Sequence, residues 1–475
     1  MNDTMNDSNF RKFRQALYGC FERAGDALMN LNDALLSGAS TGRFVELSQS
    51  PFFERRWSSL YEATKDGCVN RNSLLVHLIS AMPVRGPAGR CVVAIDSSKA
   101  ERPQSVTARD RTLVHKDNLP ECRAPVTPGW QFSTVAVAPA TASSWCYILD
   151  NERIASDKTP TQVAAEQLRK IVPVIRQAHG VRPLVVADSG YGTAPFLKQT
   201  RGIECDKLVR MKGFRNLYRA PGPPDPHKRG PHFKDGPIFK CHDPGTQGEP
   251  DASSSGMDEK GRVVKVDCWN NLHFKECRES SISLLRITRE GAAQTKRDPR
   301  QSWFFWEGDT PAPLSDAHLN YKFRFCIEHS YRFEKQDLNW TQPRLRTPEQ
   351  FQLWTLMVSV VQDQLFLARE LVERQRLPWE DPNRPITPEQ VRRGMGPLLA
   401  KLGTPARPPK PRGMNAKGRA KGAVVRLATR YAVIKKDSKP RKKAATKPTA
   451  GATRQPKART QEARTQERKG VARAA

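Results

Sequence analysis

Two aspartates follow apolar segments at positions where carboxylates could do chemistry. Asp96 follows the run CVVAI, and Asp188 follows the run LVVA. Short apolar runs without alternation predict strands that are buried on both faces, where an unpaired charge is costly. If the two strands are neighbours, both carboxylates lie at one end of the same sheet. Either aspartate alone could equally be a turn residue or a helix cap.

A third acidic residue lies in a segment with helical character, residues 316–338. Tyr321, Arg324, Glu328 and Lys335 are offset by 0, 3, 7 and 14 residues. At about 100° per residue these offsets fall within about 60° on one helix face. That face would present a phenol, a guanidinium, a carboxylate and an ammonium group. The alternative is an internal ladder of ion pairs, with Arg324 pairing Glu328 at i,i+4.

The spacing Tyr-(2)-Arg-(3)-Glu-(6)-Lys resembles the signature of DDE transposases of the insertion-sequence type. This is the branch with a ribonuclease-H-like core and a β-rich insertion before the catalytic glutamate. The resemblance extends to Asp96 in CVVAIDSS and to Asp188 in VVADSGYG, and it covers roughly residues 86–375. It implies a fold and a chemistry that the rest of the chain can be compared with.

The resemblance implies a two-metal phosphoryl transfer. Asp96, Asp188 and Glu328 are the expected catalytic residues and metal ligands. Hard oxygen donors suit two Mg²⁺ ions, for which Mn²⁺ can substitute. The metals would activate water for cutting and then a DNA 3′-OH for joining, and they would stabilise the leaving oxygen. The expected partners are double-stranded DNA, as terminal inverted repeats and as target, and a second copy of the chain in a homodimer on that DNA.

The resemblance also implies which side chains contact the DNA. Tyr321, Arg324 and Lys335 would grip phosphates near the cut end, because guanidinium, ammonium and hydroxyl groups are the usual backbone contacts. Arg332 and Arg210 are weaker candidates, for which a solvated surface charge is the alternative.

Trp303 lies 18 residues before Tyr321, near the place where related enzymes stack a flipped base on an aromatic side chain. Stacking of this kind can offset the few kcal/mol that unstacking a base costs. The alternative for Trp303 is a place in the core of a β-structure.

The elements that would position these residues follow a β-β-β-α-β-α-β order. Strands are expected at 91–95, 129–137, 144–149, 184–187 and 206–211, with helices at 161–178 and 194–201. Buried strands flanked by helices predict an α/β fold with a mixed sheet. Further strands at 263–266, 281–287 and 303–306 indicate a β-rich insertion, and a last helix is expected at 348–374, where Thr347 and Gln350 form a capping box.

Five regions result from this division of the chain. They are a helical N-terminal domain that could bind DNA ends (1–85), the first part of the ribonuclease-H-like core (86–213), the β-rich insertion (214–314), the second part of the core with the Glu328 helix (315–378), and a basic, largely disordered tail (379–475).

The positive charge is concentrated near the C-terminus. The chain has a net charge of +30, and residues 401–475 hold 23 Lys and Arg against 3 Asp and Glu, a net of +20. Such a segment has too little apolar surface to offset its ordering entropy, and it suits a polyanion such as DNA. A solubilising tail is the alternative. Residues 430–436, RYAVIKK, form a small apolar island without an assigned role.

Several other classes are disfavoured by the sequence. The chain has no apolar run near the ~20 residues of a membrane span, and its ten cysteines form no CxxC pair, so we expect a protein of the bacterial cytoplasm, associated with DNA. The His and Cys residues of the insertion match no closed zinc pattern. Two other functions stay open: a nuclease of the same fold that cuts without joining, and an inactive, element-derived DNA-binding protein.

Overall fold

The computed structural model describes residues 5–38, 43–116, 125–140, 144–223, 227, 233–295, 298–411, 418, 422–424 and 427–436. These residues all fall in one compact unit, Met1–Lys436. None of the helices in the described ranges is both long enough and apolar enough to cross a membrane. Of the basic tail expected at 379–475, residues 437–475 lie outside the described residues.

Four helices make up the N-terminal region. They are α1 (Asp7–Gly19), α2 (Gly25–Leu36), α3 (Ser58–Asp66) and α4 (Arg71–Ala81), with the short strands β1 (Phe21–Arg23) and β2 (Cys68–Val69) pairing between them. In the sequence, apolar residues recur at helical spacing from Phe10 to Leu35 and predict one helix. The structure divides this repeat into α1 and α2, because the chain turns at Ala24, which has a left-handed φ of 54°. Both helices still face the same core, so the repeat alone does not reveal the break.

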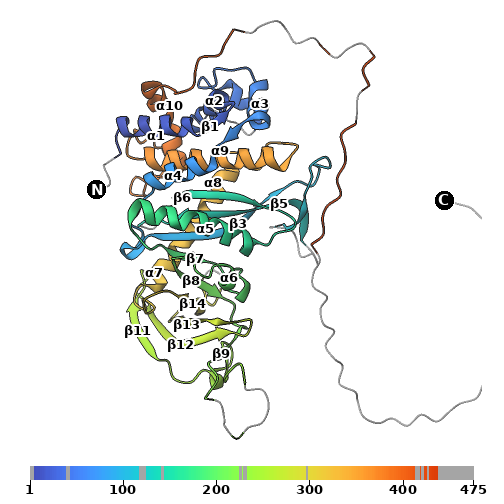
Figure 1. Ribbon diagram of the computed structural model, residues 1–475. Coiled ribbons are helices and arrows are strands. Elements are labelled where there is room, and N and C mark those ends of the chain that lie inside the picture. Colours follow the sequence, from blue (N-terminus) through green and yellow to red (C-terminus); the bar gives the residue numbers. More distant parts are fainter. Residues whose placement is uncertain are drawn as a thin grey trace, which may run out of the picture. The chain divides into compact units, whose positions relative to one another are not determined.

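The core of the molecule is a mixed sheet flanked by helices, as predicted. Its strands are β3 (Val92–Glu101), β5 (Val126–Val137), β6 (Tyr147–Ile154), β7 (Leu184–Ala187) and β8 (Asp206–Met211), with α5 (Pro160–His179) and α6 (Ala194–Gln199) between them in the chain. The spatial order is β6-β5-β3-β7-β8. The pairs β5–β6 and β3–β5 are antiparallel, whereas β3–β7 and β7–β8 are parallel (Figure 1).

One strand is longer than predicted. The parallel pairing of β3 with β7 stops at Ile95, but its antiparallel pairing with β5 continues to Glu101. The apolar run predicted that the strand ends before Asp96, but Asp96 lies within β3. The polar residues that follow Asp96 are accommodated because β3 has only β5 beside it from that point.

The insertion extends the same sheet. Its strands are β9 (Asn216–Arg219), β10 (Ile238–Lys240), β11 (Ala252–Met257), β12 (Val263–Phe274), β13 (Cys277–Arg289) and β14 (Gln301–Glu307). Strand β14 pairs antiparallel with β8, so the order runs β10-β9-β12-β13-β14-β8-β7-β3-β5-β4, where β4 is Thr112–His115. The insertion is thus fixed to the core through main-chain hydrogen bonds.

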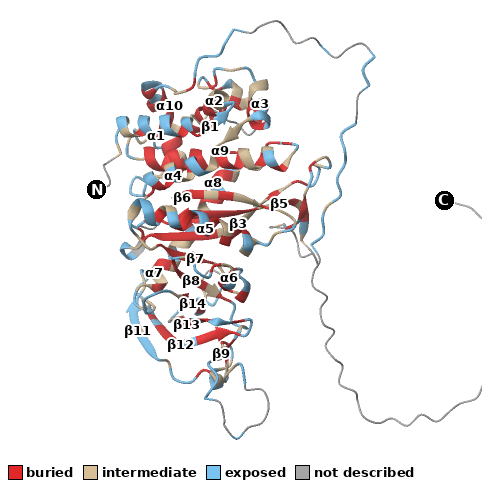
Figure 2. Cartoon of the chain, viewed as in Figure 1, coloured by how far each residue is buried: buried red, intermediate tan, exposed pale blue. Residues whose placement is uncertain are grey.

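The helices after the insertion are α7 (Ala317–Lys322), α8 (Cys326–Gln336), α9 (Pro348–Ala368) and α10 (Pro388–Leu402), and the 3₁₀ turn η4 (Phe323–Phe325) separates α7 from α8. Three further 3₁₀ turns occur earlier in the described chain: η1 (Phe44–Gln49), η2 (Pro87–Gly89) and η3 (Pro244–Thr246). The single helix expected at 316–338 is therefore interrupted by η4. Helix α9 begins at the predicted capping box of Thr347 and Gln350. It is almost entirely buried, whereas β11 is exposed (Figure 2).

Helix α10 lies inside the segment that was expected to be a largely disordered tail from 379. It begins at a second capping box, formed by Thr387 and Gln390, and it buries Val391, Met395 and Leu399. These apolar residues recur at helical spacing, and they offset the ordering of a segment whose overall composition is basic.

Candidate active site

The two aspartates lie side by side at the carboxyl edge of the parallel strands. Ile95 of β3 and Ala187 of β7 are register partners, and Asp96 and Asp188 are the next residues along their strands. The Asp188 carboxylate accepts a hydrogen bond from the Gly190 amide at 2.9 Å, and the Asp96 carboxylate accepts one from the Ser97 amide at 2.8 Å. The sequence argument that placed both carboxylates at one end of the sheet therefore agrees with the register.

Arg324 joins the third acidic residue to this edge. One guanidinium nitrogen is 3.0 Å from Oδ2 of Asp96, and the other is 2.8 Å from Oε1 of Glu328. The Arg324 side chain is only 11% exposed, whereas that of Glu328 is 42% exposed. The i,i+4 pair that the sequence offered as an alternative is present, and the same guanidinium also reaches Asp96.

The carboxylates of this cluster lie close enough to change one another's pKa. Burial raises the pKa of Asp96 to about 6; Arg324 opposes that shift, while the charges of Asp188 and Glu328 add to it. Burial alone would lower the pKa of Arg324, but Tyr321 and the two carboxylates that it contacts raise it above the ordinary value. Arg324 contacts two of the three carboxylates, and the Asp188 charge adds to theirs, so the site favours additional positive charge.

Tyr321 belongs to the same cluster. Its ring contacts Phe304 edge-on, with centroids 4.6 Å apart, and the Arg324 guanidinium lies 5.7 Å from its centroid. Burial raises the pKa of its hydroxyl. Among the described residues, the buried hydroxyl makes no hydrogen bond of good geometry.

The remaining predicted DNA contacts lie elsewhere on the surface of α8 or in the sheet. The Lys335 ammonium lies 5.7 Å from the centroid of the Trp340 ring and 6.0 Å from that of Tyr331. Arg332 is exposed on the same helix. Arg210 occupies the position on β8 next to the register pair Ala187 and Val209, which places it beside Asp188.

Trp303 is a core residue. It is 4% exposed and packs against Trp269, with ring centroids 5.7 Å apart, and against Phe239 at 6.2 Å. Strand β14 is central in the sheet, between β13 and β8, so its aromatic side chains fill the interior. The expectation that Trp303 stacks on a flipped base is therefore corrected in favour of the alternative, a place in the β-core.

Sequence reasoning missed a group of hydroxyls behind Asp96. Thr134 is its register partner on β5, and Tyr191 and Tyr331 are buried beside it. Burial raises the pKa of both tyrosines, and the Asp96 charge contributes. Tyr191 was visible in the motif ADSGYG, but the contribution of Thr134 depends on strand pairing and has no local signal.

The donor set bears on which ion could bind. In the described part of the chain, no group of three or more His, Cys, Asp or Glu side chains is spaced to hold a metal ion. The Arg324 guanidinium lies between Asp96 and Glu328 and supplies the positive charge there. The surrounding acidic donors are carboxylate oxygens, which suit hard cations.

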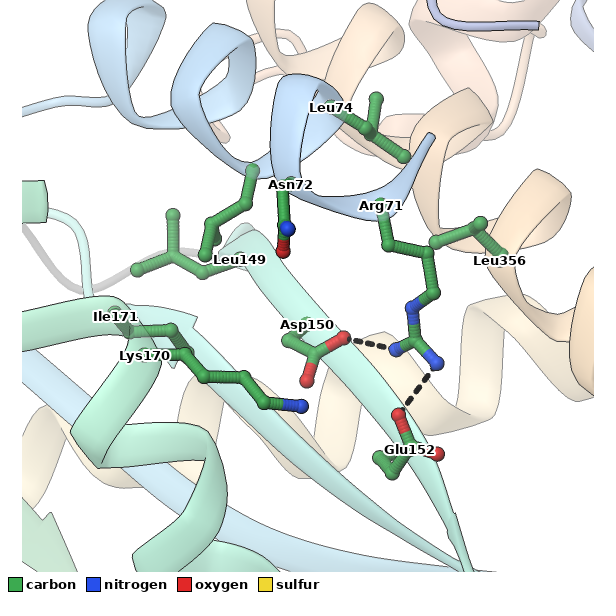
Figure 3. A pocket seen from close by; sticks show the side chains of 10 residues that line it. Arg71, Asn72, Leu74, Leu149, Asp150, Glu152, Lys170, Ile171 and Leu356 are labelled. Carbon is green, nitrogen blue, oxygen red and sulfur yellow. Dashed lines mark hydrogen bonds and ion pairs between the residues drawn. The ribbon is translucent and has the colours of Figure 1, made fainter. Parts of the chain in front are cut away.

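A groove between α4, β6 and α5 lies on the face of the sheet opposite to the one that carries the Asp96 side chain. Arg71 enters it and pairs with Asp150 at 2.7 Å and with Glu152 at 2.5 Å (Figure 3). Asp150 also accepts a hydrogen bond from Gln167 of α5, whereas the neighbouring Asn151 reaches Ser359 of α9. Because Asp150 and Glu152 already neutralise the Arg71 guanidinium, we interpret this groove as part of the packing interface between the N-terminal helices and the core.

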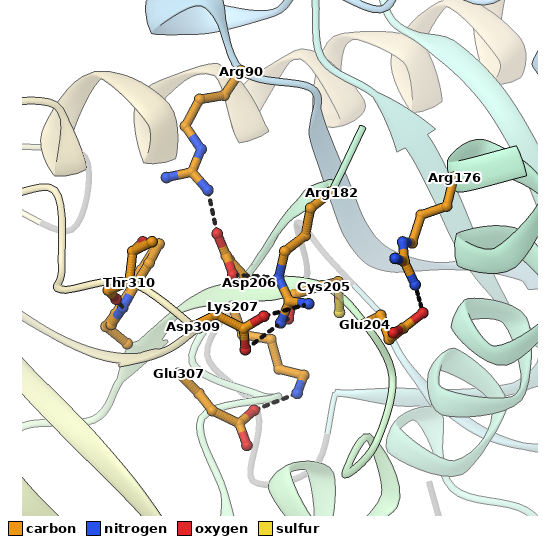
Figure 4. A network of polar contacts seen from close by, with 11 residues as sticks. Arg90, Arg176, Arg182, Glu204, Cys205, Asp206, Lys207, Glu307, Asp309 and Thr310 are labelled. Carbon is orange, nitrogen blue, oxygen red and sulfur yellow. Dashed lines mark hydrogen bonds and ion pairs between the residues drawn. The ribbon is translucent and has the colours of Figure 1, made fainter. Parts of the chain in front are cut away.

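A polar network lies at the amino edge of β8, opposite the carboxylates. Asp206 accepts hydrogen bonds from Arg90 and, at 2.8 Å, from Arg182 (Figure 4). Lys207 pairs across the strands with Glu307 of β14, and Arg182 also reaches Asp309 at 2.9 Å. This network connects the insertion to the core through ion pairs.

Comparison with known proteins identifies one family. The family model described as DDE superfamily endonuclease matches residues 16–269. The match includes Asp96 and Asp188 and ends before Glu328. No curated protein matches the sequence significantly. The solved structures include a piggyBac transposase synaptic complex with hairpin DNA, with a TM-score of 0.37 and 8% sequence identity over 81% of this chain and 74% of that chain.

Proposed function

Because this chain belongs to the DDE superfamily of endonucleases, we propose that it is a DNA transposase that cuts the ends of its own mobile element and joins them to target DNA. The single observation that carries the proposal is the convergence of three distant carboxylates: Asp96 and Asp188 follow a register pair, and Glu328 shares a guanidinium with Asp96. The family assignment made from the sequence is confirmed, and the branch remains a proposal.

The sheet supports a ribonuclease-H-like core. Three antiparallel strands, β6, β5 and β3, are followed by the parallel strands β7 and β8. This arrangement puts the two aspartates on adjacent strands, and α8 packs against β3 from one side. The β-rich segment that precedes α8 matches the branch with an insertion before the glutamate.

Asp96, Asp188 and Glu328 are not spaced to hold a metal ion while Arg324 lies between Asp96 and Glu328. With Arg324 moved away, the three carboxylates would hold the metal ions, most simply two Mg²⁺. When bound, such ions activate the attacking oxygen and stabilise the leaving oxygen. Arg324 occupies part of this space, so it would exchange its carboxylate partners for a DNA phosphate, to which it can donate two parallel hydrogen bonds. The buried Tyr321 hydroxyl would then donate to the same backbone.

Two ends must be cut and joined, so we propose that two copies of the chain act on one pair of ends. Double-stranded DNA is the proposed partner, with water as the first nucleophile and the freed 3′-OH as the second. An endonuclease that cuts without joining would share every residue of this site and would differ only in the second step.

Asp188→Asn tests the proposal. The probe is a labelled duplex that carries the DNA flanking the coding region, incubated with Mg²⁺ or Mn²⁺. We expect the variant to bind the duplex as the unchanged chain does and to lose cleavage by at least 100-fold. Asp66→Asn, on the exposed end of α3, is the matched control and should cut normally. Cleavage by Asp188→Asn at the normal rate would refute the assignment, and a target plasmid in the same reaction distinguishes joining from cutting alone.

A further inference from the structure

One row of side chains crosses from the core into the insertion at the level of Asp188. Arg210 of β8 lies beside Asp188, and its register partner on β14 is Phe304. Phe304 in turn pairs with Leu285 of β13. Side chains of register partners point to the same face of a sheet, and the contact of Phe304 with Tyr321 shows that α7 lies on this face. The insertion therefore continues the face that carries Asp188 (strands β7, β8, β14 and β13 in Figure 1).

Arg289 lies on the same face, at the end of β13. It is four residues beyond Leu285, so the two side chains point the same way. Because β13 and β8 are both antiparallel to β14, these four residues lead in the carboxyl direction of β7 and β8, by about 13 Å at ~3.3 Å per residue. Strand β13 is three strands from β7, or about 14 Å across the sheet. By these spacings the Arg289 backbone is about 20 Å from that of Asp188.

The Arg289 guanidinium is a half-buried cation beside other cations. Burial lowers its pKa, and the charge of Arg262 lowers it further. Asp258 and Asp298 oppose this shift, whereas Arg210 adds to it. Both aspartates already pair with Arg262, at 2.7 Å and 2.8 Å, and within the described ranges no side-chain hydrogen bond or ion pair engages Arg289 itself. The place therefore has excess positive charge, and an anion there would relieve the repulsion.

His318 of α7 shares these surroundings. Burial lowers the pKa of its imidazole, and the charge that lowers it most is that of Arg289. Asp316 and Asp258 act in the opposite direction, and Lys322 adds to the effect of Arg289. The buried Nδ1 of His318 makes no hydrogen bond among the described residues. The imidazole is therefore a second group that gains from a nearby anion, both through a hydrogen bond and through easier protonation.

We propose that Arg289, Arg210 and His318 form a phosphate-binding site, in which the insertion holds one backbone phosphate of the bound DNA at a set distance from the cut. The site rests on the proposed function, which supplies the DNA and places the cut at Asp188. A guanidinium can donate two parallel hydrogen bonds to a phosphate, and the imidazole can add a third. At about 3.4 Å per base pair, a separation of about 20 Å puts this phosphate within about six base pairs of the cut. Phosphate contacts position a duplex without reading its sequence, so this site would set the place of cleavage.

Nuclear magnetic resonance of the full-length chain, labelled with ¹³C at histidine Cε1, tests the geometry without DNA. The His318 signal is identified by its loss in His318→Gln, and its pKa is read from a pH titration. We expect Arg289→Met to raise the pKa of His318, because the charge that lowers it most is removed. Lys275→Met is the matched control: it removes a cation from the exposed turn between β12 and β13, about 40 Å from Arg289 along β13, and should leave that pKa unchanged. An unchanged pKa of His318 in Arg289→Met would overturn the shared site.

A binding assay tests the phosphate contact. Duplexes of the flanking DNA each carry one uncharged methylphosphonate, at successive positions within about six base pairs of the element boundary, and their binding is measured by fluorescence anisotropy without metal. At one position we expect the unchanged chain and Lys275→Met to lose affinity about ten-fold. Arg289→Met should bind the unmodified duplex about ten-fold more weakly, and a methylphosphonate at that position should not weaken its binding further.

The outcomes separate this site from the proposed function. If the chain binds the flanking duplex but Arg289→Met keeps the sensitivity of the unchanged chain at every position, the phosphate site alone is refuted. Cleavage by Asp188→Asn at the normal rate would refute the active-site assignment, and it is measured independently of the methylphosphonates. A chain that binds no flanking duplex would overturn both.

Discussion

At the scale of single residues, the site is a cluster of negative charge that one guanidinium holds together. Arg324 bridges Asp96 and Glu328, and burial keeps the pKa of Asp96 near 6 despite that contact. A positively charged side chain in this position both stabilises the metal-free protein and competes with cations. The same residue can therefore be examined without any DNA substrate.

Arg324→Met should separate these two effects. Removal of the guanidinium takes the ion-pair partner from Asp96 and Glu328, so we expect a loss of about 2–3 kcal/mol in unfolding free energy in the presence of a chelator. Addition of Mg²⁺ should then raise Tm by more than it does in the unchanged chain, because the competing cation is gone. Arg332→Met, on the exposed side of α8, is the control and should change neither quantity. Equal Mg²⁺ responses in Arg324→Met and the unchanged chain would count against a metal site here.

A second residue-scale prediction concerns Glu334. It is fully buried between α8 and α9, accepts one hydrogen bond from Ser359, and burial raises its pKa to about 8. The folded state therefore holds a proton that the unfolded chain releases above its ordinary pKa of about 4.5, so Glu334 lowers stability progressively as pH rises from about 4.5 to 8.

Glu334→Gln removes that titration. The variant should gain on the order of 1–3 kcal/mol over the unchanged chain at pH 8, and little at pH 4.5, when unfolding by urea is measured at both values. Glu62→Gln, on the surface of α3, should show no such pH-dependent difference. A gain at pH 4.5 equal to that at pH 8 would mean that Glu334 is not the group that titrates.

At the scale of elements, the turn that carries Asp188 depends on close packing against β8. A Cβ at Gly192 would lie 2.2 Å from the Arg210 carbonyl oxygen, so only glycine fits at that point. We expect Gly192→Ala to move the turn, to cost about 1–3 kcal/mol in stability, and to reduce cleavage at least ten-fold. Gly213→Ala is the matched control, since its Cβ would meet only Trp303 at 3.8 Å. Normal cleavage by Gly192→Ala would show that Asp188 does not need this position.

The elements that position the site were largely predictable because they are apolar. The runs before Asp96 and Asp188 read directly as buried strands, and the register places their aspartates together. The extension of β3 to Glu101 was not predictable, because it depends on pairing with β5 rather than on its own pattern. The 3₁₀ turn Phe323–Phe325 has no sequence signal either, although it turns Arg324 toward Asp96.

The remaining wrong predictions concern residues that tertiary contacts bury, which the local sequence does not show. Trp303 was placed near DNA from its distance to Tyr321 along the chain, but the pairing of β14 with both β13 and β8 encloses it. Helix α10 was hidden by the basic composition around it. The apolar island 430–436 is too short to show a periodicity, and its contacts with Val106 and Arg111 join residues more than 300 positions apart.

At the scale of the whole molecule, one continuous sheet connects the insertion and the core. Strand β14 extends the sheet from β8 on one side, and on the other side Ile434 forms an isolated bridge with Thr112 of β4. Asp96 and Asp188 lie between these two ends, where the parallel pairing of β3 with β7 stops.

The central claim is that Asp96, Asp188 and Glu328 share a pair of divalent cations once Arg324 moves to a phosphate. The most direct measurement is a crystal structure of the chain with Mn²⁺ and an uncleavable end duplex, in which anomalous scattering locates each ion. The account predicts two manganese peaks within coordination distance of these three carboxylates, with the Arg324 guanidinium on the DNA backbone. Manganese bound elsewhere, with Arg324 still bridging Asp96 and Glu328 on bound DNA, would contradict it.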